Sequence, residues 1–72
     1  MTKNELEFTV FCIEMVAERL GLPGEEIYKA LTEKSNILDN YIIPCYDALH
    51  TQGKDYIVND IIEVMREDGL EV

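Results

Sequence analysis

The sequence predicts a single all-α domain over residues 1–72, a compact bundle of about four helices. Apolar residues recur at intervals of three and four over long stretches, which places them on one face of a helix. Hydrophobic residues make up 47% of the chain and charged residues 29%, a composition typical of globular proteins. A chain of 72 residues is also too short for two domains, which usually hold ~100 residues each.

The first helix is expected from Leu6 to Leu20. Five apolar residues keep helical spacing and four others fill the adjoining arc: Leu6, Val10, Ile13, Ala17 and Leu20, then Phe8, Cys12, Met15 and Val16. Only a narrow stripe around Glu7, Glu14 and Glu18 is polar. A helix that is apolar on nearly every side needs cover from several neighbours, so we expect it at the centre of the bundle.

The second helix is expected from about Gly24 to Lys34, after a turn at Gly21 and Pro23. Gly21 suits the left-handed residue that ends a helix, and Pro23 cannot continue the first helix but can open the next. Lys34 then lies in the last turn, where the helix dipole favours positive charge. The expected buried face is Ile27, Ala30 and Leu31, with Tyr28 at its edge.

The spacing of Ala17, Gly21 and Ile27 resembles a helix-turn-helix motif. A small residue is needed at Ala17 because a bulky side chain there would hold the second helix away. In a DNA-binding motif the first residues of the second helix face bases and phosphates, and this chain has Glu25 and Glu26 there. The spacing therefore predicts a packed helical corner, and its charges oppose DNA binding.

The third helix is expected to be kinked or split at Pro44. Helical spacing runs from Leu38 to Leu49, and Ser35 or Asn36 is a suitable N-cap. Proline has no amide hydrogen for the Asn40 carbonyl and crowds it, so either a kink or two short helices should result.

The last helix is expected from Tyr56 to Glu67, with Gly69 placed to end it. Its buried face is Val58, Ile61, Ile62 and Met65. An alternative remains at its start, because residues 56–58 favour a strand and Asp60 could cap a shorter helix.

The residues that catalysis or metal binding requires are scarce. His50 is the only histidine, Ser35 the only serine, and Cys12 and Cys45 lie far apart in apolar segments. We therefore predict no enzymatic activity, no cofactor and no metal site. The cysteines are expected to be buried free thiols, and His50 to end a helix.

The net charge of −9 opposes binding to nucleic acid or to an anionic membrane surface. No segment approaches the ~20 apolar residues that span a bilayer, and the first residues do not have the pattern of a signal peptide. These features predict a cytoplasmic protein.

Five aromatic residues are the candidates for a partner-binding surface: Phe11, Tyr28, Tyr41, Tyr46 and Tyr56. Tyrosine is enriched at protein interfaces, although these side chains could instead cap the bundle edges with their hydroxyls in water. Phe11 lies beside the acidic stripe, either under another helix or exposed. Because so short a chain buries only ~60% of its unfolded surface, a protein partner or a homodimer would add stability.

Three stretches, Phe8–Glu14, Ile27–Ser35 and above all Tyr41–Val58, resemble a family of short bacterial proteins of unknown function, the 3791-type small acidic helical proteins. The resemblance covers about Leu6 to Glu67 and supplies no catalytic residues. Proteins of this kind are often encoded beside proteins that resemble ADP-ribosyltransferases, which implies a partner role such as that of an antitoxin. The predicted function is a small acidic protein-interaction module, and the alternative is a helix-turn-helix DNA-binding regulator that acts as a dimer.

Overall fold

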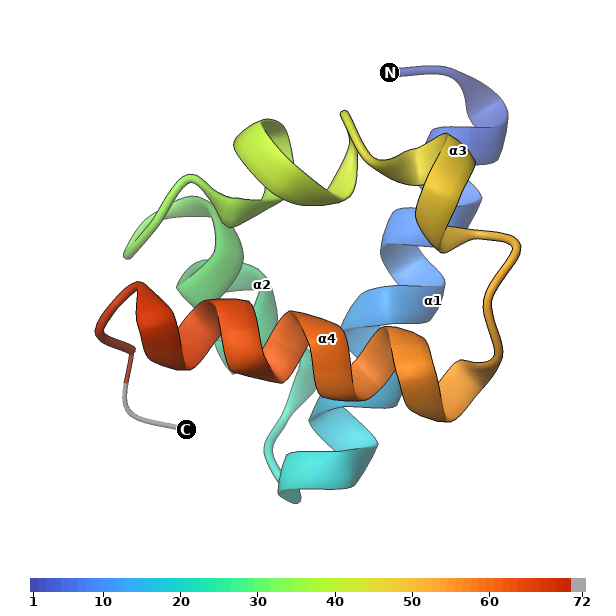
Figure 1. The fold of residues 1–72 in the computed structure, drawn as a ribbon. Helices are drawn as coiled ribbons and strands as arrows, with labels where there is room; N and C mark the ends of the chain where they lie inside the picture. The colour runs from blue at the N-terminus through green and yellow to red at the C-terminus, as the bar shows by residue number, and fades with distance from the viewer. Residues whose placement is uncertain (71–72) are drawn as a thin grey trace.

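The structure, a computed structural model, describes residues 1–70, and the regular elements of this part are all helices (Figure 1). In chain order they are α1 (Lys3–Leu20), α2 (Gly24–Thr32), the π-helix η1 (Leu38–Ile42), α3 (Tyr46–Leu49) and α4 (Lys54–Glu67). The predicted all-α bundle is confirmed, with the expected third helix present as two short ones.

Helix α1 begins three residues before its predicted start because a capping box precedes it. The Thr2 hydroxyl accepts from the Glu5 amide at 3.1 Å, and the Glu5 carboxylate accepts from the Thr2 amide at 2.8 Å. The helix ends as predicted at Gly21, which has a φ of 68°, and the Leu22 amide donates to the Ala17 carbonyl at 3.0 Å.

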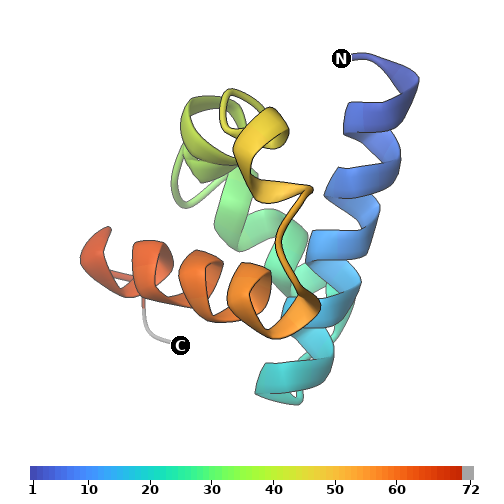
Figure 2. The ribbon, with the colours of Figure 1, turned by 45° about the vertical axis from the view of Figure 1, so that its right-hand side comes forward.

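The prediction that α1 lies at the centre of the bundle is wrong. In Figure 2 α1 stands at one edge of the molecule, with α3 and α4 on the same side of it. Its buried residues are Thr9, Cys12, Val16 and Ala17. Leu6 and Val10, which we expected on the buried stripe, are 54% and 45% exposed. Helical spacing identified residues that share a face, but the other helices cover only part of that face.

The predicted helical corner between α1 and α2 is confirmed. Ala17 and Ile27 are both buried in the core, and Gly21 supplies the left-handed turn between them. The expected buried face of α2 is also confirmed.

The prediction that Lys34 lies in the last turn of α2 is wrong, because the helix ends two residues earlier. The Ser35 hydroxyl donates to the Ala30 carbonyl at 2.7 Å and accepts from the Ile37 amide at 3.3 Å. Ser35 thus closes α2 and leads the chain toward η1, but the prediction that Ser35 or Asn36 is the N-cap is wrong, because η1 is preceded by Ile37 and has no side-chain cap.

The third helix is split at Pro44, one of the two expected arrangements. In η1 the Ile43 amide donates to the Leu38 carbonyl at 3.0 Å, one residue further back than in an α-helix. Pro44 has no amide hydrogen to continue this pattern, and a turn leads to α3, which begins at Tyr46.

Helix α4 begins at Lys54, so the alternative of a strand at residues 56–58 is wrong. Gly69 has a φ of 85°, and the Leu70 amide donates to the Met65 carbonyl at 3.0 Å, which completes the predicted helix end. The core joins α1, α2, η1 and α4, and its largest fully buried side chains are Ile27, Leu31, Ile42, Ile61, Met65, Val16, Val58 and Cys12. Among residues 1–70 no helix is both long and apolar enough to cross a membrane.

Candidate interaction surface

The five aromatic residues proposed for partner binding lie on five different helices. They are Phe11 on α1, Tyr28 on α2, Tyr41 on η1, Tyr46 on α3 and Tyr56 on α4. Tyr28 and Tyr56 are 49% and 55% exposed, on separate helices. The structure brings only Phe11 and Tyr46 into one group of rings, so the predicted residues do not form a single surface.

Four partly exposed rings on α1 and α3 form the aromatic cluster: Phe8, Phe11, Tyr46 and His50. The Phe8 ring stacks beside Phe11 with centroids 6.3 Å apart, and it packs against Tyr46 in a T-shaped arrangement with centroids 5.4 Å apart. The Tyr46 ring lies parallel to His50 at 4.3 Å. Phe8 links the two helices. Its role was not predicted, because residue spacing carries no information about a tertiary contact such as that with Tyr46.

His50 has the predicted position at a helix end. It follows the last residue of α3, and its Nδ1 lies 2.7 Å from the Tyr46 carbonyl oxygen. The exposed imidazole thus covers one face of Tyr46, while Phe8 packs against the same ring in a T-shaped arrangement. The four residues of α3 are held on α1 by this arrangement.

Tyr41 has a structural partner. Its hydroxyl donates to Oδ2 of Asp60, which joins η1 to α4. This hydrogen bond, helped by partial burial, raises the pKa of Tyr41 well above its usual value of 10.0, because a phenolate would face the Asp60 carboxylate. The Tyr41 hydroxyl therefore stabilises the fold and is not free to bind a partner.

Both cysteines are free, as predicted, but only one is fully buried. Cys12 lies in the core, and burial raises the pKa of its thiol to about 12. Cys45 is only half-buried, because it lies in the turn between η1 and α3. The expectation that both thiols are buried is therefore wrong for Cys45.

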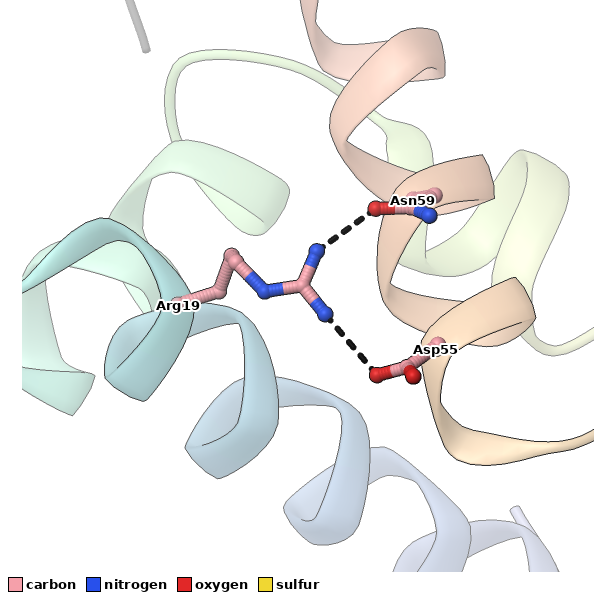
Figure 3. A network of polar contacts seen from close by, with 3 residues as sticks. All are labelled: Arg19, Asp55 and Asn59. Atoms are coloured by element: carbon pink, nitrogen blue, oxygen red, sulfur yellow. Dashed lines mark hydrogen bonds and ion pairs between the residues drawn. The ribbon is translucent and has the colours of Figure 1, made fainter.

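The ends of α1 and α4 are joined at the surface by Arg19 (Figure 3). Its Nη1 donates to Asn59 at 2.6 Å and its Nη2 donates to Asp55 at 3.0 Å. Because Asp55 and Asn59 lie one turn apart on α4, the planar guanidinium spans both. This network orients two helices relative to one another.

The outer face of α1, defined as Leu6, Glu7, Val10 and Glu14, is exposed along its whole length. Glu7 and Glu14 lie between Val10 and the half-buried Phe11, since residues three and four apart are neighbours on a helix. The exposed apolar side chains therefore adjoin acidic groups, which in turn adjoin the aromatic cluster. This face was not predicted, because helical spacing placed Leu6 and Val10 on the buried stripe.

Within the described part of the chain, no three His, Cys, Asp or Glu side chains lie close enough together to hold a metal ion. On the surface, α1 presents apolar, acidic and aromatic groups side by side.

Comparisons with curated proteins and with solved structures found no match to this chain. A family model described as "Protein of unknown function (DUF3791)" matches residues 7–68. The matched segment includes the helical corner, the split third helix, the aromatic cluster and all of α4. Because the match spans most of the chain, the protein belongs to the DUF3791 family of proteins of unknown function.

Proposed function

We propose that this protein is a cytoplasmic protein-interaction module that binds a partner protein through the aromatic cluster. The observation that carries the proposal is the stacking of four partly exposed rings from α1 and α3 at one place on the surface. Aromatic side chains are enriched among the residues that dominate binding energy, because they bury a large area at low entropic cost.

The net charge of the module indicates the charge of the surface that it binds. A net charge of −9 attracts a cationic protein surface, speeds their encounter and disfavours association with nucleic acid. In the sharpest form of the proposal, the module is an antitoxin-like partner of an ADP-ribosyltransferase-like protein encoded beside it. That form rests on the family resemblance, and an acidic helical module is suited to cover a cationic NAD-binding or target-binding cleft.

Affinity capture from the native lysate at physiological salt tests the proposal, with nuclease treatment as a control. We expect one stoichiometric protein with the unmodified chain and with Tyr56→Ala, a matched change at an exposed tyrosine of α4. Tyr46→Ala should lose the partner, whereas Tyr46→Phe keeps the ring and should retain it. Circular dichroism establishes that each variant is folded.

Capture of the chain alone by the unmodified protein would contradict the proposal. For the antitoxin form, co-expression with the neighbouring gene product should relieve any growth defect which that product causes. If the two proteins neither co-purify nor restore growth, the antitoxin form is wrong while a different protein partner is still compatible with the module.

A second candidate function is a helix-turn-helix DNA-binding regulator that acts as a dimer, which the corner geometry at Ala17 and Gly21 favours. Exposed Glu25 and Glu26 at the start of α2 oppose it, and Lys29 on that helix already pairs with Glu25 at 3.3 Å. This candidate requires DNA binding at low salt that weakens as salt is added and is lost in Lys29→Glu. A mobility-shift titration measures both properties.

A further inference from the structure

Helix α1 has the heptad pattern of a coiled-coil seam. The a and d positions are Leu6, Val10, Ile13, Ala17 and Leu20. The C-terminal half of this seam is covered by the protein itself, since Ala17 is buried and α2 begins beside Ile13. A Cβ on Gly24 would lie 3.7 Å from Cγ2 of Ile13.

The N-terminal half of the same seam is open. Leu6 is 54% exposed and Val10 is 45% exposed, although both continue the line of side chains that α2 covers further along the helix. Figure 2 shows this end of α1 extending past α2 at the edge of the molecule. Within residues 1–70, a helix surface suited to helix packing thus lacks a covering helix from Leu6 to Val10, which is rather more than one turn.

We call the exposed part of the seam, Leu6 and Val10, the open half-seam. The residues on its two flanks differ in chemistry. Glu7 and Glu14 both occupy the e position, seven residues apart, and both are exposed on the outer side. Neither forms an ion pair within residues 1–70, where the two ion pairs are Arg19 with Asp55 and Lys29 with Glu25. The g positions Thr9 and Val16 are buried against the core, so only the acidic flank is available.

We propose that a cationic amphipathic helix of a partner protein packs along the open half-seam of α1. Its apolar residues would cover Leu6 and Val10, and its Lys or Arg side chains would lie opposite Glu7 and Glu14. In coiled coils the residues beside the seam select the partner by charge, so this acidic flank requires a basic one. The inference rests on the proposed function, because it describes the partner of that module.

Net charge favours a cationic helix over a second copy of the chain as the occupant of the open half-seam. Two copies would each carry a net charge of −9, and an antiparallel pair of α1 helices would place glutamates opposite glutamates. A cationic helix meets no such repulsion, and its binding is weakened by salt.

A titration of the isotope-labelled protein with a synthetic peptide, followed by NMR amide shifts, tests the inference. The peptide has about three heptads, with Leu at a and d and Lys at e and g. We expect the amide shifts to concentrate on the first half of α1. A peptide with Glu in place of every Lys should not bind.

Matched double variants separate seam packing from general attraction. Leu6→Ser with Val10→Ser should weaken binding about tenfold or more, because it removes both apolar contacts. Leu22→Ser with Tyr56→Ser changes two equally exposed apolar residues elsewhere and should change the dissociation constant by less than about twofold.

A charge exchange tests the acidic flank. Glu7→Lys with Glu14→Lys should reject the Lys peptide and accept the Glu peptide. Glu63→Lys with Glu67→Lys gives the same change in net charge at exposed positions of α4, and it should retain the preference for the Lys peptide. An equal loss in both variants would overturn the inference, as would amide shifts spread over the whole surface.

The remaining outcomes distinguish the inference from the proposed function. If sedimentation shows a dimer that Leu6→Ser with Val10→Ser dissociates, the occupant is a second copy and the inference is overturned. If a captured partner binds this variant as well as the unmodified chain, the inference is wrong and the interaction module stands. Peptide binding on α1 with no captured partner would support the seam and contradict the proposed function.

Discussion

The two long helices and the split segment are stabilised in different ways. Helices α1 and α4 have 18 and 14 residues, and each is followed within two residues by a glycine with positive φ, Gly21 and Gly69. The split segment, residues 37–50, contains a five-residue π-helix and a four-residue α-helix. Helices that short do not persist by their own hydrogen bonds, so burial, the Tyr41 hydrogen bond to Asp60 and the aromatic cluster must hold them. The long helices therefore form the scaffold, and the split segment depends on it.

The largest expected difference between the two regions is in thiol reactivity. Cys12 lies in α1 with a pKa of about 12, whereas half-buried Cys45 lies in the split segment. Reaction at Cys12 requires the scaffold to open, so Cys45 should be alkylated at least ~100-fold faster. Mass spectrometry of the peptides after timed alkylation measures both rates. Equal rates in the folded protein would show that the two regions open together, and equal rates in denaturant are the control.

A core truncation in the scaffold should cause the largest loss of stability. Ile61 on α4 is completely buried, and Ile61→Ala should lower the free energy of unfolding by about 2–5 kcal/mol. Urea denaturation followed by circular dichroism measures the loss. The matched change Leu6→Ala, at an exposed position of α1, should stay within about 0.5 kcal/mol. A similar loss at both positions would mean that the end of α1 is covered in solution.

The corner between α1 and α2 should be sensitive to one backbone angle. Gly21 has a φ of 68°, so Gly21→Ala should cost about 1–2 kcal/mol although no atom lies within 4 Å of the added Cβ. Gly24→Ala, three residues later, meets only an ordinary contact with Ile13 and should be neutral or slightly stabilising. The same denaturation experiment compares them. A neutral Gly21→Ala would contradict the argument from the left-handed turn.

The helical corner of the scaffold and the split segment also differ in how far the sequence predicts them. The corner was predictable because Gly21 and Ala17 act locally, through a backbone angle and a small side chain. The π-helix was not, because hydrophobic spacing indicates a helix near Pro44 without specifying how wide its turns are. The candidate site was predicted only in part. Phe11 and Tyr46 meet through Phe8, a tertiary contact that no spacing reveals.

The exposed half-seam of α1 has a related explanation. The spacing of Leu6, Val10 and Ala17 correctly placed them on one face of a helix. Which helices cover that face depends on the length and direction of α2, and α2 has only nine residues. Periodicity therefore identified the seam but assigned its open end to the core, and that open end is where we propose the partner helix.

The attachment of the split segment to α4 should contribute less to the free energy of unfolding than the Gly21 turn does. Tyr41→Phe removes the hydroxyl that donates to Asp60 and should lower the free energy of unfolding by about 0.5–1 kcal/mol at neutral pH, because the bond is only partly buried. Tyr56→Phe, at an exposed tyrosine of α4, is the control and should have no measurable effect. A loss as large as that of Ile61→Ala would place Tyr41 in the scaffold.

Alkaline pH should weaken the same attachment. Because the folded protein holds the Tyr41 proton more tightly than the unfolded chain, the folded state binds more protons above pH 10.0, and stability falls as pH rises further. Cys12 acts in the same direction, from pH 9.0 to about 12. Denaturation midpoints across that range should fall less steeply in Tyr41→Phe than in the unmodified chain. Parallel curves would assign the whole decline to Cys12 and other groups.

The smallest expected effect is that of the surface ion pair between Arg19 and Asp55, which joins the two helices of the scaffold. Arg19 bonds two residues of α4, but the side chains of Arg19 and Asp55 are 39% and 83% exposed, so water and salt screen their attraction. A double-mutant cycle of Arg19→Ala and Asp55→Ala should give a coupling free energy of about 0.3–0.5 kcal/mol that decreases with added salt. Coupling above about 1.5 kcal/mol would mean that this polar contact holds the scaffold more strongly than the Tyr41 hydrogen bond holds the split segment. The smaller value follows if buried apolar side chains already fix α1 against α4, so that Arg19 adds orientation to a contact made without it.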